Sequence, residues 1–167
     1  MEDSVDLRLD QWRAERPDLP LGAMGIIGRV QRAALIFERE LRDHFAAHDL
    51  QIGEFDMLAT LLRSGPPYRL TAGHLVASSM KTSGAITNRI DHLVAKQLVT
   101  RDVDPDNRRR VLIALTETGK ELVDRVVDCH VALEERLLEG MEPQARDDLT
   151  RLLRTLLITL GDTAPLK

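Results

Sequence analysis

Apolar residues recur every three to four positions over most of the chain, a pattern that is typical of amphipathic helices. Proline, glycine and small polar residues interrupt the pattern and mark the helix ends. From residue 98 to 115 the pattern changes to alternation around the turn sequence Asp104-Pro105-Asp106-Asn107, which predicts a hairpin. We therefore expect strands over 98–102 and 111–115, and helices over 6–15, 23–48, 54–63, 72–78, 82–96, 116–138 and 144–160.

Two short helices joined by a tight turn and followed by a hairpin predict a winged helix-turn-helix. The fold class expected is mainly α, with a small β wing and with N- and C-terminal helices that form a dimerisation region. The leucine stripe of the last helix is too apolar to remain in water. The expected organisation is an N-terminal extension helix in 1–22, dimerisation helices in 23–50 and 117–161, and the winged helix-turn-helix in 53–116.

Charge is distributed unevenly along the 167 residues, whose net charge is −4. Between Thr60 and Leu115 nine Lys and Arg face four Asp, giving +5, so the rest of the chain carries −9. A basic centre between acidic ends favours a DNA reader that carries helical dimer arms.

The start of the 82–96 helix and the hairpin tip carry the candidate DNA contacts. Short polar side chains at the helix start would allow it to enter a major groove, and arginines at a wing tip suit a narrow minor groove. The candidates are Lys81, Thr82, Ser83, Gly84, Thr87, Asn88, Arg108, Arg109 and Arg110. The alternatives are a helix cap beside a solvated hairpin tip, or a winged helix that binds another protein; the latter would be expected to carry apolar anchors at the tip.

No motif for an enzyme, a cofactor or a metal site occurs in the sequence. Cys129 is the single cysteine, which fits a reducing compartment, and we expect it to be buried packing in its helix. No apolar run approaches the roughly 18–20 residues that span a bilayer. We therefore expect a cytoplasmic protein that is not an enzyme.

The segment LVTRDVDPDNRRRVLIALT, residues 98–116, resembles the wing of the MarR family of transcription regulators. The resemblance extends over nearly the whole chain from Ala23. It implies a homodimer whose two winged helices read a pseudo-palindromic operator in double-stranded DNA, most commonly as a repressor. The chain departs from the family pattern at Asn107, where an aspartate usually precedes the two arginines, and at Gln97, where glycine is common.

Three further segments resemble the urate-responsive branch of that family: DLRLDQWRAERPDLPL, GEFDMLATLLRSGPPYRLTAGHL and SGAITNRIDHL. The resemblance implies an effector site made by a tryptophan of an extra N-terminal helix, an aspartate, and two arginines. The matching residues here are Trp12, Asp56, Arg89 and Arg101.

The chemistry of these four residue types suits a planar purine anion such as urate or xanthine. Asp56 would accept ring N–H bonds, Arg89 and Arg101 would donate charge-assisted bonds, and Trp12 would stack on the ring. Because Arg89 lies on the reading helix and Arg101 at the wing base, ligand binding is expected to release DNA. A phenolic effector or an oxidant is the alternative signal. Each residue also has a purely structural interpretation, such as an Asp56–Arg89 salt bridge.

Overall fold

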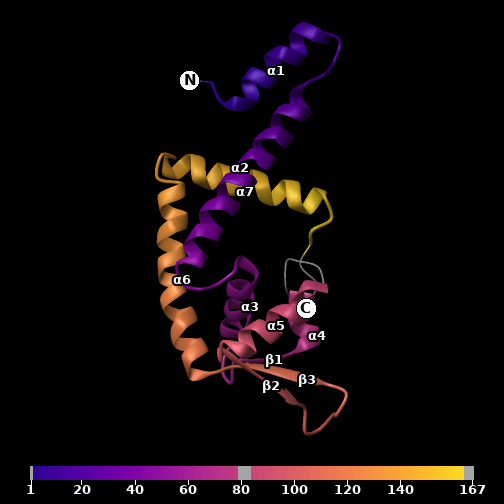
Figure 1. The fold of residues 1–167 in the computed structure, drawn as a ribbon. Coiled ribbons are helices and arrows are strands. Elements are labelled where there is room, and N and C mark those ends of the chain that lie inside the picture. The colour runs from indigo at the N-terminus through magenta and orange to yellow at the C-terminus, as the bar shows by residue number, and fades with distance from the viewer. Residues whose placement is uncertain (1, 79–83, 164–167) are drawn as a thin grey trace. The chain divides into compact units, whose positions relative to one another are not determined.

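The computed structural model describes residues 2–78 and 84–163, which form seven helices and one three-stranded antiparallel sheet (Figure 1). The fold is therefore mainly helical with a small sheet, as predicted. The helices are α1 (Ser4–Glu15), α2 (Gly22–Ala46), α3 (Ile52–Arg63), α4 (Ala72–Ser78), α5 (Gly84–Ala95), α6 (Glu117–Leu137) and α7 (Pro143–Thr159). The strands are β1 (Arg69–Thr71), β2 (Val99–Val103) and β3 (Val111–Leu115).

Every predicted helix and both predicted strands are present, with ends within two residues of the expected positions. Strand β1 was not predicted. It pairs with β3 from Arg69 opposite Ala114 to Thr71 opposite Leu112, so the sheet order is β1-β3-β2. Three residues are too few to display alternation, and the strand exists only because β3 supplies its hydrogen-bonding partner.

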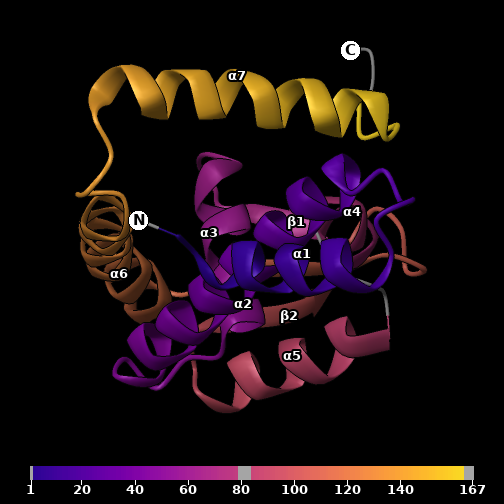
Figure 2. The ribbon, with the colours of Figure 1, turned by 90° about the horizontal axis from the view of Figure 1, so that it is seen from above.

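The chain forms two compact units, residues 1–126 and 127–167. The core of the first unit gathers side chains from α3, α4, α5, β3 and the start of α6. The fully buried ones include Leu58, Leu75, Leu93, Ile113 and Val123. Within this unit α5 packs beside β2, and α4 packs against β1 and β3 (Figure 2).

Helix α2 connects this core to the N-terminal extension. At its C-terminal end the Phe45 ring stacks on Phe55 of α3, with ring centroids 4.3 Å apart. At its N-terminal end α2 packs against α1, as Figure 1 shows. Val5 of α1 lies against Gly28 and Leu9 lies against Gly25, where the absence of side chains lets the two helices approach closely.

Helix α1 begins with a capping box, in which Asp3 accepts from the backbone of Val5 and Asp6 while Asp6 accepts from the backbone of Asp3. Arg29 of α2 donates to the carboxylates of Asp3 at 2.8 Å and Asp6 at 2.5 Å. These bonds hold the pKa of both carboxyls below the usual value, chiefly through the backbone donors and then through Arg29. The extension is thus attached to α2 by both apolar and charged contacts.

The second unit contains the C-terminal part of α6 and helix α7. Arg146 fixes the turn between them, donating to Glu135 at 2.7 Å and to the carbonyls of Leu138 and Met141. Most leucines of α7 remain exposed, including Leu152 at 57%, and Leu160 directly after the helix is 72% exposed.

Cys129 of α6 is exposed in this chain, so the prediction that it is buried packing is wrong. Helical spacing placed it between valines but could not show which side of the helix another element covers. No described helix is long and apolar enough to cross a membrane.

Candidate DNA interface and effector site

Helix α5 presents the polar residues of the predicted reading surface at its start. Thr87 and Asn88 are exposed, and Gly84 is the first residue of the helix. Lys81, Thr82 and Ser83 lie outside the described residues. The described part of the predicted surface therefore leaves two short polar side chains accessible, as groove entry requires.

The wing tip is an ordered turn between β2 and β3. The amide of Asp104 donates to the carbonyl of Arg110, and the Asn107 side chain accepts from the amide of Arg109 at 3.1 Å. Asn107 thus orders the tip as a neutral acceptor. Arg108, Arg109 and Arg110 are exposed, and none forms an ion pair with a described residue. Their charge is therefore available to a phosphate or a groove.

The base of the wing is joined to α5 by one ion pair. Arg101 of β2 donates to Asp91 at 2.8 Å, with both side chains about half exposed at 45% and 55%. This places Arg101 against the middle of the reading helix, on a different side from Arg89, because residues two apart point in different directions.

The end of α5 is attached to the start of α3 through a buried carboxylate. Glu54 is 1% exposed and accepts from Lys96 at 3.1 Å and from the amide of Gln51 at 2.9 Å. Lys96 also donates to the carbonyl of Asp49. A charge this deeply buried needs a partner, so Lys96 fixes the position of α5 on α3.

Arg89 also lies against the first turn of α3, above Gly53. A Cβ built on Gly53 would lie 2.5 Å from the Cζ atom of Arg89. Asp56 is three residues farther along α3 and therefore shares that face of the helix. Among the described residues, neither the Asp56 carboxylate nor the Arg89 guanidinium has a hydrogen-bond or ion-pair partner. The expected structural alternative, a salt bridge between them, is not formed in the described structure.

Trp12 does not join this cluster within one chain. It is 44% exposed on α1, beyond Leu9, which meets Gly25 near the start of α2. Phe45 at the other end of α2 contacts α3, so about 20 residues of helix, or roughly 30 Å, separate Trp12 from Asp56. Of the four proposed effector residues, the structure places Arg89 on the face of α3 that carries Asp56, pairs Arg101 with Asp91, and leaves Trp12 distant.

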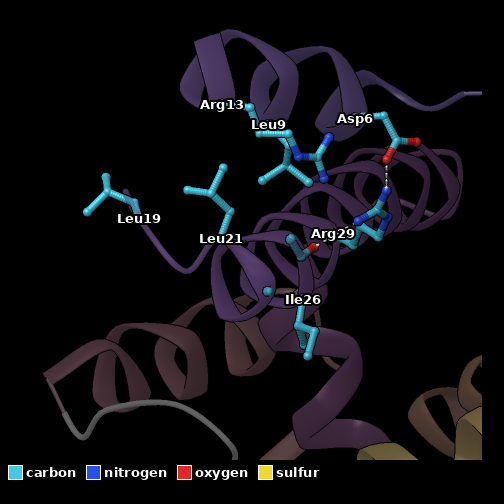
Figure 3. Close-up of a pocket in the computed structure, with 9 residues that line it drawn as sticks. Asp6, Leu9, Arg13, Leu19, Leu21, Ile26 and Arg29 are labelled. Carbon is cyan, nitrogen blue, oxygen red and sulfur yellow. Dashed lines mark hydrogen bonds and ion pairs between the residues drawn. The ribbon is translucent and has the colours of Figure 1, made fainter. Parts of the chain in front are cut away.

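Trp12 instead borders a groove of about 340 Å³ between α1 and α2, together with Met24, Ile27 and Leu35. A second cavity of about 420 Å³ lies where α1 turns into α2 (Figure 3). The charged groups lining that cavity are already paired, Asp6 with Arg29 and Arg13 with Asp10. This distinguishes it from the Asp56–Arg89 cluster. No group of described residues could hold a metal ion.

Sequence reasoning missed Gly53 and Asp91, which contact the predicted site residues Arg89 and Arg101, and it also missed the pair of Lys96 with Glu54. Glu54 had a local signal, because a glutamate three residues after the start of a helix is typical of a capping box. The other three had none, since their roles depend on contacts between distant segments.

Known proteins resemble the chain along most of its length. The MarR family profile matches residues 48–110. The HTH-type transcriptional regulator PecS of Dickeya dadantii (strain 3937) is 37% identical over 145 residues, which cover 87% of each chain.

Solved structures share the fold at lower identity. A mutant MarR of E. coli, in complex with operator DNA, matches with a TM-score of 0.69 and 22% identity over 87% of this chain and 97% of that one. The organohalide-sensing regulator RdhR, in its 2,4-dichlorophenol-bound form, matches with a TM-score of 0.76 and 16% identity over 90% of this chain and 92% of that one.

Proposed function

Because the chain belongs to the MarR family of transcription regulators, we propose that it is a DNA-binding repressor released by a small anionic aromatic ligand such as urate or xanthine. Two copies would bind a pseudo-palindromic operator. The proposed reading surface is the start of α5 together with Lys81, Thr82 and Ser83 of the preceding sequence, with the wing arginines in the adjacent minor groove.

The homodimer would form through the terminal helices. Leu152 and Leu157 of α7 and Leu160 directly after it expose 48–72% of their surface, and Ile26 of α2 exposes 60%. Apolar side chains clustered at helical spacing lose a favourable burial energy when they face water. A second copy of the same chain would cover them and would also set the spacing of two reading helices.

The observation that carries the ligand proposal is that Arg89 of α5 lies against Gly53, on the face of α3 that also bears Asp56. Among the described residues, neither charged group has a hydrogen-bond or ion-pair partner, so both can bond a ligand. A purine anion offers ring N–H donors for the carboxylate and oxygen acceptors for the planar guanidinium. These complementary groups favour such a ligand over a purely apolar one.

Arg101 would couple this site to DNA release. Its pair with Asp91 is largely exposed and therefore stabilises the wing by only about 0.2–1 kcal/mol. A charge-assisted bond to a bound anion is worth about 1.5–3 kcal/mol, so the ligand can outcompete Asp91 for Arg101. Losing the pair frees the wing base from α5 and changes the geometry that fits the operator. The expected coupling is about 1–3 kcal/mol.

The test is an electrophoretic mobility assay on the DNA upstream of this protein's own gene, titrated with urate, xanthine and a phenolic acid. We expect the purines to release the DNA and to raise the melting temperature of the free protein. Asp56→Asn and Arg89→Lys should retain DNA binding but require more purine, because each loses ligand-specific bonds while the second keeps its charge.

If the phenolic acid releases the DNA and the purines do not, the effector is a phenolic compound and the purine proposal is wrong. DNA binding that shows no salt dependence would contradict the DNA-reading function itself, because phosphate contacts always carry one.

A further inference from the structure

We propose that Gly53 is a positioning residue whose missing side chain provides the seat for the Arg89 guanidinium. The effector role of that seat rests on the function proposed above. The seat itself rests only on geometry within the first compact unit.

The approach of Arg89 to Gly53 leaves no room for a side chain. A Cβ on Gly53 would lie 2.5 Å from Cζ and 3.0 Å from Cδ of Arg89, and separations under 3.0 Å essentially never occur for real Cβ atoms. The two residues come from helices that are far apart in the sequence, so the contact belongs to the docking of α5 on α3.

The backbone of α3 does not itself require glycine at this position. Gly53 is the second residue of the helix and is not among the residues with positive φ, which include Gly65 and Gly161. Glycine inside a helix is destabilising relative to alanine, because it loses more conformational freedom on folding. The close approach of Arg89 is therefore the structural reason for a glycine here.

Among the described residues, the contact that orients Arg89 is its packing against Gly53, and this has a consequence for the effector site. Lys96, which directly follows α5, is held by the buried Glu54 at 3.1 Å. Arg89 has no such hydrogen-bond or ion-pair partner among the described residues. Seated on Gly53, its guanidinium stays on the face that carries Asp56, and a ligand need not order it first.

A methyl group at position 53 should displace Arg89 without unfolding the protein. The displaced group is the end of a flexible, half-buried side chain, which can rotate toward solvent. We expect Gly53→Ala to preserve or raise the melting temperature and to raise the urate concentration that releases half of the DNA by about fivefold or more.

The matched control is Gly22→Ala, at the start of α2, where an added Cβ meets nothing within 4 Å. It makes the same chemical change at the beginning of a helix. The urate concentration that releases half of the DNA should therefore stay unchanged. In an Arg89→Ala background, Gly53→Ala should have no further effect, because the two changes act on one interaction.

A second measurement reports on the seat without any effector. We expect the Nε–H resonance of Arg89, assigned by its loss in Arg89→Ala, to relax as an ordered group in the native protein and as a mobile one in Gly53→Ala. An equally ordered Arg89 in Gly53→Ala would overturn the seat. If the same urate concentration releases half of the DNA from Gly53→Ala and from the native protein, the effector role of the seat is wrong. If urate and xanthine release no DNA from the native protein, the proposed effector is wrong. The relaxation of the Arg89 Nε–H resonance then still tests whether Gly53 orders the Arg89 side chain.

Discussion

Arg101 at the base of the wing donates a 2.8 Å hydrogen bond to Asp91 in the middle of the reading helix. The predicted reading helix and the wing are therefore connected by an exposed ion pair, as well as by the packing of α5 beside β2. A contact that contributes little to folding can still fix the relative position of the two elements.

Removing this pair should change DNA binding more than stability. We expect Asp91→Ala to alter the free energy of unfolding by less than about 1 kcal/mol. Operator affinity should fall, and less urate should be needed for release, because Arg101 no longer has to leave a partner. The charge-reversed pair Asp91→Arg with Arg101→Asp should restore operator affinity. Native affinity in Asp91→Ala, measured by mobility shift, would argue against the connection.

The wing arginines should contribute to affinity through phosphate or groove contacts. Arg109 is exposed and has no ion-pair partner among the described residues, so Arg109→Ala should leave the melting temperature within experimental error. Its operator affinity should fall, and the slope of log K against log salt should decrease by about 0.9 if one phosphate contact is lost. Arg136→Ala, an exposed arginine of α6, is the control. An unchanged slope and affinity in Arg109→Ala would place the wing away from DNA.

The Lys96–Glu54 pair should affect stability strongly. Glu54 is 1% exposed, so Lys96→Met would remove the ammonium that bonds its buried carboxylate and leave the His92 imidazole, at 3.8 Å, beside it. We expect the free energy of unfolding to fall by about 3 kcal/mol, measured by urea denaturation. Adding Glu54→Gln should recover part of the loss, because the buried charge is then gone. A loss no larger than that of Arg101→Met, which breaks an exposed pair, would contradict this role.

Acid should loosen α1 before it unfolds the core. The pKa values of Asp3 and Asp6 are lowered by backbone donors and by Arg29, so their stabilisation is complete above the unfolded value of about 3.9. It is lost as pH falls through their lower folded-state values. Trp12, the only tryptophan, lies on α1 and reports this change by fluorescence. We expect the acid fluorescence transition to require less acid in Arg29→Met; an unchanged midpoint would show that Arg29 does not hold α1.

The roughly 30 Å between Trp12 and Asp56 predicts that Trp12 serves the effector site of a second copy. Dimers mixed from Trp12→Ala and Arg89→Ala chains then contain one site with both residues intact. We expect such heterodimers to recover urate binding at half the native stoichiometry, although each homodimer binds poorly. Heterodimers that bind no better than either homodimer would remove Trp12 from the site.

The local pattern of the sequence was sufficient to predict the order of the helices and the hairpin of the wing. Apolar spacing and turn residues act over a few positions, so helix α4 was predicted with its observed ends. Strand β1 could not be predicted in this way, because its three residues become a strand only by pairing with β3.

The candidate site shows the same division between local and distant interactions. Arg89, Asp56 and Arg101 could be proposed from the segments in which they occur. Their partners are decided by the docking of α5 on α3 and of the wing on α5, which brings together residues 36 positions apart in Arg89 and Gly53. Chain periodicity carries no information on such contacts. The sequence by itself thus determined which elements and chemical groups are present, whereas only the tertiary structure decided which groups are paired, which remain unpaired, and that Trp12 lies far from the rest.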